Sequence, residues 1–433
     1  MKFGHKIAIG LVAGFILGVI IHSLIGDICP TSPSWVKAAY YMQHPSAKIG
    51  RYMFIFCNTA GEIFLRLIRM IVIPLIFVSI TLAVAELGDL RKLRKIGVVT
   101  ILYFMGTTSL AVILGMILVN VIKPGVNTSL NITTFAATTP GISTSLLDAV
   151  IKIVPDNIFE ALANPDILQI VFFGIILGAA IGMLGEKCRT ILKLLHDLNH
   201  VINLIVKWIL FFLPLGVLFL IARAFGQFGL GVISPLAKYM ATVLTGLGIH
   251  LLIILPAVLW LLGKMNPLKA FEGLGDTMAT AFSTSSSSAT LPVNIRDCTE
   301  NLGVPRRIAN FVLPLGATIN MDGTALYEAV AAIFIAQAYG LNLTITEQLT
   351  IFIVAILAAV GAAGIPQAGL FTIVIVLKSV NLPVEGIGLI LAVDSILDMC
   401  RTTVNVLGDS FGTVVVARLT GETRKKEVQQ VSE

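Results

Sequence analysis

Polar side chains near the C-terminal end of the chain recur at a spacing that places them on one face of a helix. At about 100° per residue, six of them in "DSILDMCRTTVNVLGD" fall within an arc of roughly 100°: Asp394, Asp398, Arg401, Thr402, Asn405 and Asp409. Three carboxylates facing one guanidinium leave an excess of negative charge that attracts cations, and the guanidinium could bind a carboxylate through two hydrogen bonds. The alternative is a structural row of ion pairs, which the cost of charges in an apolar segment disfavours.

A second polar stretch, "GATINMDGTALYEA" at 316–329, contains two glycines that weaken a helix. No Lys or Arg occurs between Arg307 and Lys378. Oxygen ligands suit hard cations, and freed backbone carbonyls could join the side chains of Asn320, Asp322, Thr324 and Glu328. A helix kink packed by small residues is the alternative interpretation.

The third stretch is the serine run "STSSSSATLP" at 283–292. By itself it is typical of a polar loop or turn. A nucleophilic serine would need a base, and no His or Lys lies near it in sequence. No Walker loop, HExxH or GxSxG motif occurs, so the sequence gives an enzyme little support. The five cysteines form no CxxC pair and indicate neither a disulfide framework nor a zinc site.

The elements that carry these stretches are apolar. The chain is 56% hydrophobic and 12% charged, whereas soluble domains carry roughly 25% charged residues. We therefore expect a polytopic, all-α membrane protein. The first apolar run, 7–25, could be a cleaved signal peptide, but no small-residue cleavage site follows it. The net charge of +6 does not indicate nucleic-acid binding, because the basic residues cluster between apolar segments.

The hydropathy pattern predicts eight spanning helices and two broken stretches. The spans are expected at about 7–25, 52–86, 97–122, 166–184, 201–225, 236–263, 308–338 and 385–417. Clusters of Gly, Pro and Ser interrupt the other two apolar stretches, about 269–295 and 348–377. Because Lys and Arg favour the cytoplasmic side, "DLRKLRK", "EKCRTILK" and both termini are expected there.

The broken stretches are expected to be re-entrant hairpins of opposite orientation. Basic residues flank 269–295 on both sides, so this segment leaves and returns to the cytoplasmic face. With both termini inside, eight spans already give an even number, so 348–377 must turn back from the outside. Broken helices that enter from opposite faces are typical of inverted-repeat transporters, in which they line a site near the midplane.

Four motifs in register, "SSSSATLP", "NMDGTALYEA", "GAAGIPQAG" and "DMCRTTVNVLGD", resemble those of the dicarboxylate/amino acid:cation symporters, the sodium-coupled glutamate and aspartate transporters. The resemblance extends from about residue 50 to 420. It implies the glutamate-transporter (elevator) fold, a homotrimer, and a single membrane domain over 1–433. A scaffold at about 1–96 and 123–225 would hold a mobile transport domain at about 97–122 and 236–420, with a cytoplasmic tail at 421–433.

The resemblance also implies roles for residues of the substrate site. Asp398 would bind the substrate's amino group and Arg401 its side-chain carboxylate, which Thr324 would also contact. Asn405 and Thr402, with the backbone of Ser285 and Ser287, would hold the amino-acid carboxylate and amino group. The tip of the second hairpin, with Ile365 and Gly369, would close over the substrate.

Three sodium sites are implied by the same resemblance, and no organic cofactor. One would use Asn405, Asp409 and the carbonyls of Gly316 and Asn320. A deeper one would use Asp322, Asn320, Thr107 and Thr108. The third would use carbonyls around Thr318, Val360 and Ala362.

The chain departs from the family pattern at two positions. Archaeal relatives carry an arginine where this chain has Ser285, and animal relatives carry one where it has Met399. We therefore expect Asp394, a member of the charge network, to lack a basic partner. Glu328 resembles the proton carrier of the animal transporters, since burial favours a neutral carboxyl group. Potassium counter-transport stays open.

These features predict a sodium-coupled symporter of L-glutamate or L-aspartate in the plasma membrane, or in the inner membrane of a Gram-negative bacterium. A neutral amino-acid carrier is an alternative that Arg401 disfavours, because a buried guanidinium needs an anionic partner. A C4-dicarboxylate carrier would leave the amino-binding Asp398 without a role. An ion channel is the remaining alternative, and it would not accumulate substrate.

Overall fold

A computed structural model of the chain describes residues 3–25, 45–88, 94–126, 154–163, 167–360, 364 and 366–422. Within these ranges the secondary structure is helical, without any strand. The all-α fold class is thereby confirmed. Of the predicted site residues, Ala362 and Ile365 lie outside the described ranges, as does most of the predicted tail at 421–433.

Several helices have the length and apolar character of membrane spans. In the described part, four could cross a membrane, or five if a pair bent by 51° counts as one span. Two of the four lie in α3 (Pro45–Gly88) and α4 (Arg94–Ile122). The third runs from Gly229 to Gly263 and contains α10 (Ile233–Ile249), and the fourth runs from Arg306 to Ala338 through α15 (Arg306–Ile319) and α16 (Asp322–Ala338). The bent pair joins α7 (Ile167–Leu184) and α8 (Arg189–Phe211) to α9 (Leu213–Phe228). The expected span at 201–225 is thus divided at Phe212 between α8 and α9.

The two stretches predicted to be broken are both helix–break–helix units. The first contains α13 (Gly275–Thr284) and α14 (Ser287–Glu300), and the second α17 (Ile345–Val360) and α18 (Gly369–Ser379). Ser285 ends α13 in the left-handed conformation, with φ of 50°. Ser286 then adopts an extended conformation and caps α14, because its hydroxyl accepts a hydrogen bond from the Ala289 N–H.

A further break divides the span expected at 308–338. It separates α15 (Arg306–Ile319) from α16 (Asp322–Ala338) at Asn320 and Met321, whose backbone is not helical. The last span, α19 (Ile387–Thr420), is continuous. The remaining described helices are α1 (Phe3–Ile25), α6 (Ile158–Ala163), α11 (Leu255–Val258), α12 (Pro267–Gly273), two π-helical turns (His250–Ile254 and Leu259–Gly263) and three short 3₁₀ turns (Gly185–Cys188, Gly229–Val232 and Val384–Gly386).

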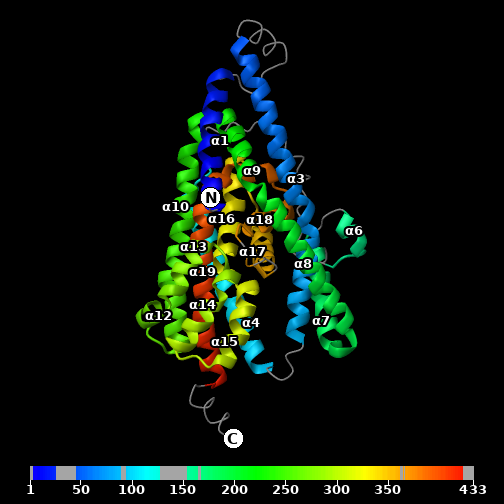
Figure 1. Cartoon of the computed structure of the whole chain (residues 1–433), viewed down its shortest axis with the longest axis vertical. Coiled ribbons are helices and arrows are strands. Elements are labelled where there is room, and N and C mark those ends of the chain that lie inside the picture. The colour runs from blue at the N-terminus through cyan, green and yellow to red at the C-terminus, as the bar shows by residue number, and fades with distance from the viewer. Residues whose placement is uncertain are drawn as a thin grey trace.

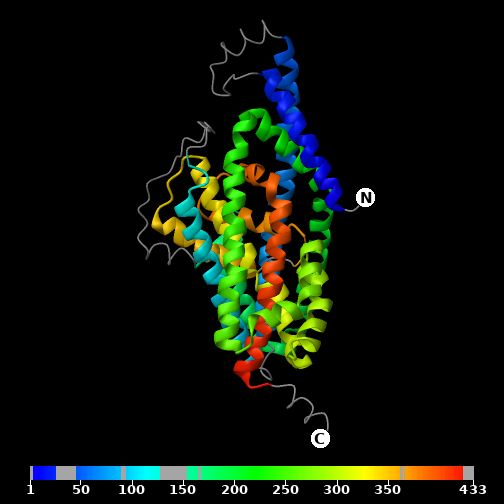
Figure 2. The ribbon, with the colours of Figure 1, turned by 90° about the vertical axis from the view of Figure 1, so that its left-hand side faces the viewer.

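The long helices are arranged along one axis of the molecule. In the view of Figure 1, α1 and α9 lie toward one end, whereas α12, α14 and α15 lie toward the other. The helices α10 and α19 run side by side, as both Figure 1 and Figure 2 show. Glycines allow α1 to approach α9 closely, since a Cβ at Gly14 would lie 2.5 Å from the Leu218 carbonyl oxygen.

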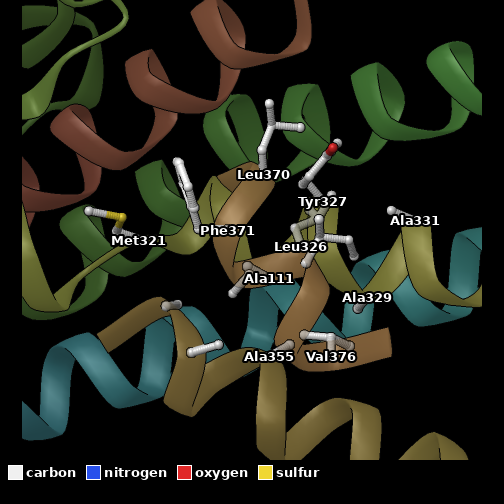
Figure 3. Close-up of a cluster of buried hydrophobic side chains, with 14 of the residues drawn as sticks. Ala111, Met321, Leu326, Tyr327, Ala329, Ala331, Ala355, Leu370, Phe371 and Val376 are labelled. Carbon is white, nitrogen blue, oxygen red and sulfur yellow. The ribbon is translucent and has the colours of Figure 1, made fainter. Parts of the chain in front are cut away.

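The most deeply buried helices are α16, α18 and α19, and one face of α4 packs against α16 and α19. Nearly every residue of α16 is buried, including Asp322 and Glu328. Figure 3 shows one apolar cluster to which α4 contributes Ala111, α16 contributes Leu326 and Tyr327, and α18 contributes Leu370. Burial on all sides means that the polar residues of this region can only be satisfied by one another or by bound ions and molecules.

Candidate functional site

Arg401 lies at the centre of a buried charged cluster on α19. Its side chain is 1% exposed. Nη1 donates to Asp394 Oδ1 at 3.0 Å, and Nη2 donates to Asp398 Oδ1 at 2.6 Å. The guanidinium carbon also lies 3.9 Å from the centre of the Tyr327 ring on α16, a cation–π contact.

The expectation that Asp394 lacks a basic partner was wrong. Asp394 lies seven positions before Arg401, so the two residues fall on the same face of α19 two turns apart. The long arginine side chain spans that distance and reaches both carboxylates at once. One guanidinium therefore takes the place of two cationic groups in this cluster.

The tip of the second hairpin lies directly on this cluster. The backbone N–H of Gln367 donates to Asp398 Oδ2 at 2.9 Å. A Cβ added at Gly369 would lie 3.1 Å from three guanidinium atoms of Arg401, which is tighter than ordinary packing. Glycine is therefore the residue that lets α18 begin against Arg401, and the closure of Gly369 over a substrate stays a prediction.

The tips of the two hairpins contact each other. Ser286 Oγ donates to the Gly364 carbonyl at 2.7 Å, and the backbone N–H of Ser288 donates to the same oxygen at 3.1 Å. Gly364 leaves no room for a side chain there, because a Cβ would lie 2.5 Å from Ser288 Oγ. The serine run, which by itself resembled a loop, therefore forms a junction between α14 and the turn before α18, buried at Ser286 and exposed at Ser288.

Asn405 joins α19 to the first turn of α16. Its Oδ1 accepts from the backbone N–H of Gly323 at 2.7 Å and from that of Thr324 at 3.4 Å. Its Nδ2 donates to Thr324 Oγ1 at 3.0 Å. The first N–H groups of a helix have no partner within the helix, so Asn405 satisfies donors that the break before α16 leaves free.

A second cluster consists only of oxygen-bearing side chains. Thr108 Oγ1 donates to Asp322 Oδ1 at 2.7 Å, and Thr107 Oγ1 donates to the same oxygen at 3.2 Å. Asn320 Oδ1 lies 3.4 Å from Thr107 Oγ1 and 3.5 Å from Thr108 Oγ1. The residues predicted for the deeper cation site are thus brought together from α4 and from the region between α15 and α16. Its oxygens suit a hard cation.

Asp409 extends the oxygen cluster toward α15. Asn320 Nδ2 donates to Asp409 Oδ1 at 3.0 Å. A Cβ at Gly316 would lie 2.5 Å from the same oxygen, so α15 and α19 are in close contact there. Gly316, Asn320 and Asp409 are therefore neighbours, as expected for another cation site. The structure does not connect this group to Asn405, which is bonded to the start of α16.

Other predicted residues take no part in these hydrogen bonds. Ser287 and Thr402 are buried and Ser285 is half-buried. In the described part of the chain, no hydrogen bond joins their side chains to Arg401. Thr318 is exposed, and its hydroxyl donates within α15 to Leu315 O. Val360 ends α17.

Glu328 is fully buried on α16. Neither of its carboxylate oxygens has a hydrogen-bond partner among the residues that the structure describes. A buried carboxyl group without a hydrogen bond is far more costly charged than neutral. The role of Glu328 in binding a proton stays a prediction.

Three further residues contact these clusters and were not predicted from the sequence: His250, Tyr327 and Gln367. His250 is fully buried, and its Nε2 lies 3.0 Å from Asp322 Oδ2. A signal for it was present, since an ionisable residue inside a long apolar segment is usually functional. Tyr327 and Gln367 carried no such signal, because an aromatic residue in a helix and a polar residue in a turn are common.

Comparison with known proteins agrees with this geometry. A family model described as "Sodium:dicarboxylate symporter family" matches residues 3–419. Excitatory amino acid transporter 3 of Homo sapiens is 40% identical over 423 residues, which cover 86% of the chain and 80% of the relative. The proton/sodium-glutamate symport protein of Geobacillus stearothermophilus is 34% identical over 429 residues, with 98% of the chain and 97% of the relative covered.

The family model covers nearly the whole chain, and both relatives align across most of their own length. The matched region includes α14, α16, α18 and α19, which together carry the charged and oxygen-rich clusters. On these grounds the chain belongs to the sodium:dicarboxylate symporter family, whose members are transporters and not enzymes.

Proposed function

We propose that this chain imports acidic amino acids, glutamate or aspartate, by sodium-coupled symport. The observation that carries the proposal is the shared position of Arg401 between Asp398 and Asp394. A free acidic amino acid brings one ammonium group and carboxylates. It would exchange partners with the Arg401–Asp398 pair, placing its ammonium group on Asp398 and its side-chain carboxylate on Arg401.

This exchange gives the site its selectivity. A buried guanidinium separated from Asp398 needs another anion, and a carboxylate meets that need through two parallel hydrogen bonds. A neutral amino acid would leave Arg401 without such a partner, and a C4-dicarboxylate would leave Asp398 without one. Two relatives support the same substrate class, because one is named an excitatory amino acid transporter and the other a glutamate symport protein.

Sodium coupling is assigned to the oxygen clusters beside the substrate site. Thr107, Thr108, Asn320 and Asp322 form one candidate cation site, and Asp409 with the carbonyls of α15 forms another. Asn320 belongs to both clusters, and Asn405 links α16 to α19 next to Arg401. An ion that orders the break before α16 would therefore also order the surface that faces the substrate, which couples the two binding events.

The transport cycle is proposed to follow the elevator arrangement of a homotrimer in the plasma membrane. The helices α4 and α10 to α19 would form the mobile transport domain and α1, α3 and α7 to α9 the scaffold. This division is supported by packing, since α4 packs on α16 and α19, whereas α1 packs on α9 and α3 on α7. Eight spans, two hairpins of opposite orientation and cytoplasmic termini complete this proposal.

Proton coupling completes the proposed cycle. Glu328 would bind a proton that moves with the substrate, as supported by its burial and by the name of the bacterial relative, a proton/sodium-glutamate symport protein. Countertransport of potassium stays open.

The test is uptake of radiolabelled glutamate and aspartate into proteoliposomes under one imposed ion gradient at a time. Uphill accumulation driven by an inward sodium gradient is expected, with unlabelled aspartate competing and alanine and succinate failing to compete. Competition by alanine would indicate a neutral amino-acid carrier, and competition by succinate a dicarboxylate carrier. Current without accumulation would instead indicate a channel.

A further inference from the structure

His250 lies beside the oxygen cluster, with a ring nitrogen facing Asp322. It opens a π-helical turn, His250–Ile254, in the apolar run that continues α10. Its side chain is fully buried, and its Nε2 lies 3.0 Å from Asp322 Oδ2. Since a carboxylate oxygen only accepts hydrogen bonds, Nε2 carries the hydrogen and donates it.

The two oxygens of Asp322 face different surroundings. Oδ1 accepts from the hydroxyls of Thr107 and Thr108 and so faces the candidate cation site. Oδ2 faces His250 on one side and the α19 backbone on the other, because a Cβ at Gly408 would lie 3.1 Å from it. Oδ1 therefore lies on the side of the threonine hydroxyls, whereas Oδ2 lies between His250 and the α19 backbone.

The local helix geometry brings His250 to this position. Gly246 lies one turn earlier on the same face of α10, and a Cβ there would lie 3.1 Å from Leu326 of α16. The absence of a side chain at Gly246 lets α10 approach α16 closely. The π turn that begins at His250 is of a kind found frequently at functional sites.

We propose that His250 is a positioning residue for the sodium site, holding the Asp322 carboxylate so that Oδ1 points at Thr107 and Thr108. Hydrogen-bond partners behind metal ligands fix the orientation of the ligand, and their loss typically weakens metal binding by roughly 10- to 100-fold. His250 is not itself a ligand in this arrangement, because its Nε2 faces the carboxylate. The inference rests on the proposed cation role of Asp322.

Two amide substitutions separate positioning from mere packing. The amide nitrogen of glutamine reaches about as far as Nε2 of histidine, whereas that of asparagine reaches only as far as Nδ1. His250→Gln therefore keeps the donor at Asp322, and His250→Asn removes it while retaining a polar side chain. Neither side chain titrates, so a result that differs between them does not come from a change in protonation.

Sodium binding is measured on the purified full-length chain by sodium-dependent thermal stabilisation without substrate, and by the sodium concentration for half-maximal glutamate uptake in proteoliposomes. For His250→Asn, both readouts are expected to shift to roughly 10- to 100-fold higher sodium, and for His250→Gln to stay within about threefold of the unsubstituted protein. Half-saturation by glutamate at saturating sodium is expected to change little in either variant. Equal sodium affinity in the two variants overturns the proposal.

Two further measurements keep the outcome decisive. In an Asp322→Asn background, His250→Asn is expected to add nothing, because its target carboxylate is gone; a full additional loss overturns the proposal. If His250→Asn does not fold, His250→Gln decides, and a sodium shift of tenfold or more would then overturn it. If Asp322→Asn leaves sodium dependence unchanged, the cation site itself is wrong, which is a separate failure.

Discussion

Arg401 and Asp398 lie three residues apart on α19, and their side chains are joined by a 2.6 Å hydrogen-bonded ion pair in the buried centre of the molecule. The same guanidinium reaches Asp394, so that its charge is divided between two carboxylates. The two groups proposed to bind opposite ends of an amino acid therefore bind each other. A substrate must replace this pairing with equivalent contacts, which only a zwitterion with a further carboxylate provides.

Replacing Arg401 by cysteine removes the partner of the substrate's side-chain carboxylate. Loss of one member of a buried ion pair costs about 3–5 kcal/mol, so glutamate and aspartate uptake is expected to fall by more than 100-fold. Uptake of serine or alanine is expected to appear, since the pocket no longer needs an anion. Arg66→Cys, at an exposed arginine, is the control. Unchanged acidic uptake by Arg401→Cys would refute the assigned role.

Gly369→Ala tests the contact between the second hairpin and Arg401. The new methyl group would lie 3.1 Å from the guanidinium, so either α18 or Arg401 must shift by a few tenths of an ångström. A loss of roughly 1–3 kcal/mol is expected for such overpacking, measured as a roughly 5- to 150-fold weaker half-saturation by glutamate. Gly106→Ala, in open space on α4, is the matched control. Gly340 also has no neighbouring atoms, but its positive φ would strain an alanine, so it does not serve as a control.

Ser286→Ala tests the junction between the hairpin tips. The substitution removes the hydrogen bond to Gly364 and the cap of α14. Loss of a helix cap costs about 1 kcal/mol, so the variant is expected to unfold at a lower temperature. Ser283→Ala removes only an exposed hydroxyl that donates within α13. This variant is expected to unfold at the same temperature as the unsubstituted protein. Equal unfolding temperatures for both variants would show that the junction does not stabilise the hairpins.

Glu328→Gln tests proton coupling. The buried carboxyl group of Glu328 has no hydrogen bond among the described residues. The transport domain with bound substrate and sodium is therefore expected to cross the membrane only when this group is protonated. Uptake by the unsubstituted protein should then decline as the pH rises and the proton is lost. Glutamine mimics the neutral form at every pH, so the profile should flatten while sodium dependence remains. An unaltered pH profile would remove Glu328 from the cycle.

Asp297→Ala tests what holds the two arms of the first hairpin together. Asp297 Oδ2 accepts from the backbone N–H and the hydroxyl of Thr277, and the side chain is 1% exposed. Leaving these donors unsatisfied is expected to cost about 1–3 kcal/mol. Asp276→Ala removes the more exposed of the two partners of Arg296 and should change stability by less than about 1 kcal/mol. Thermal unfolding of both variants measures the difference.

The sequence by itself determined the fold class and the segments that carry the site. Low charge and long apolar runs require helices, because a helix satisfies its own backbone hydrogen bonds. Gly, Pro and Ser clusters marked the breaks at Ser285–Ser286 and before Gly369 correctly. The spacing of Asp394, Asp398 and Arg401 also followed from the sequence, since residues on one helix face keep their relation in any packing.

Only the tertiary structure decided which groups meet across helices. Arg401 of α19 lies 3.9 Å from the centre of the Tyr327 ring of α16, and no pattern within either helix connects the two residues. His250 and Asp322 are 72 positions apart, so no local pattern could connect them. The physical reason is that periodicity specifies the direction of a side chain on its own helix, whereas contacts between helices depend on how closely the helices pack, which small residues such as Gly246 and Gly408 decide here.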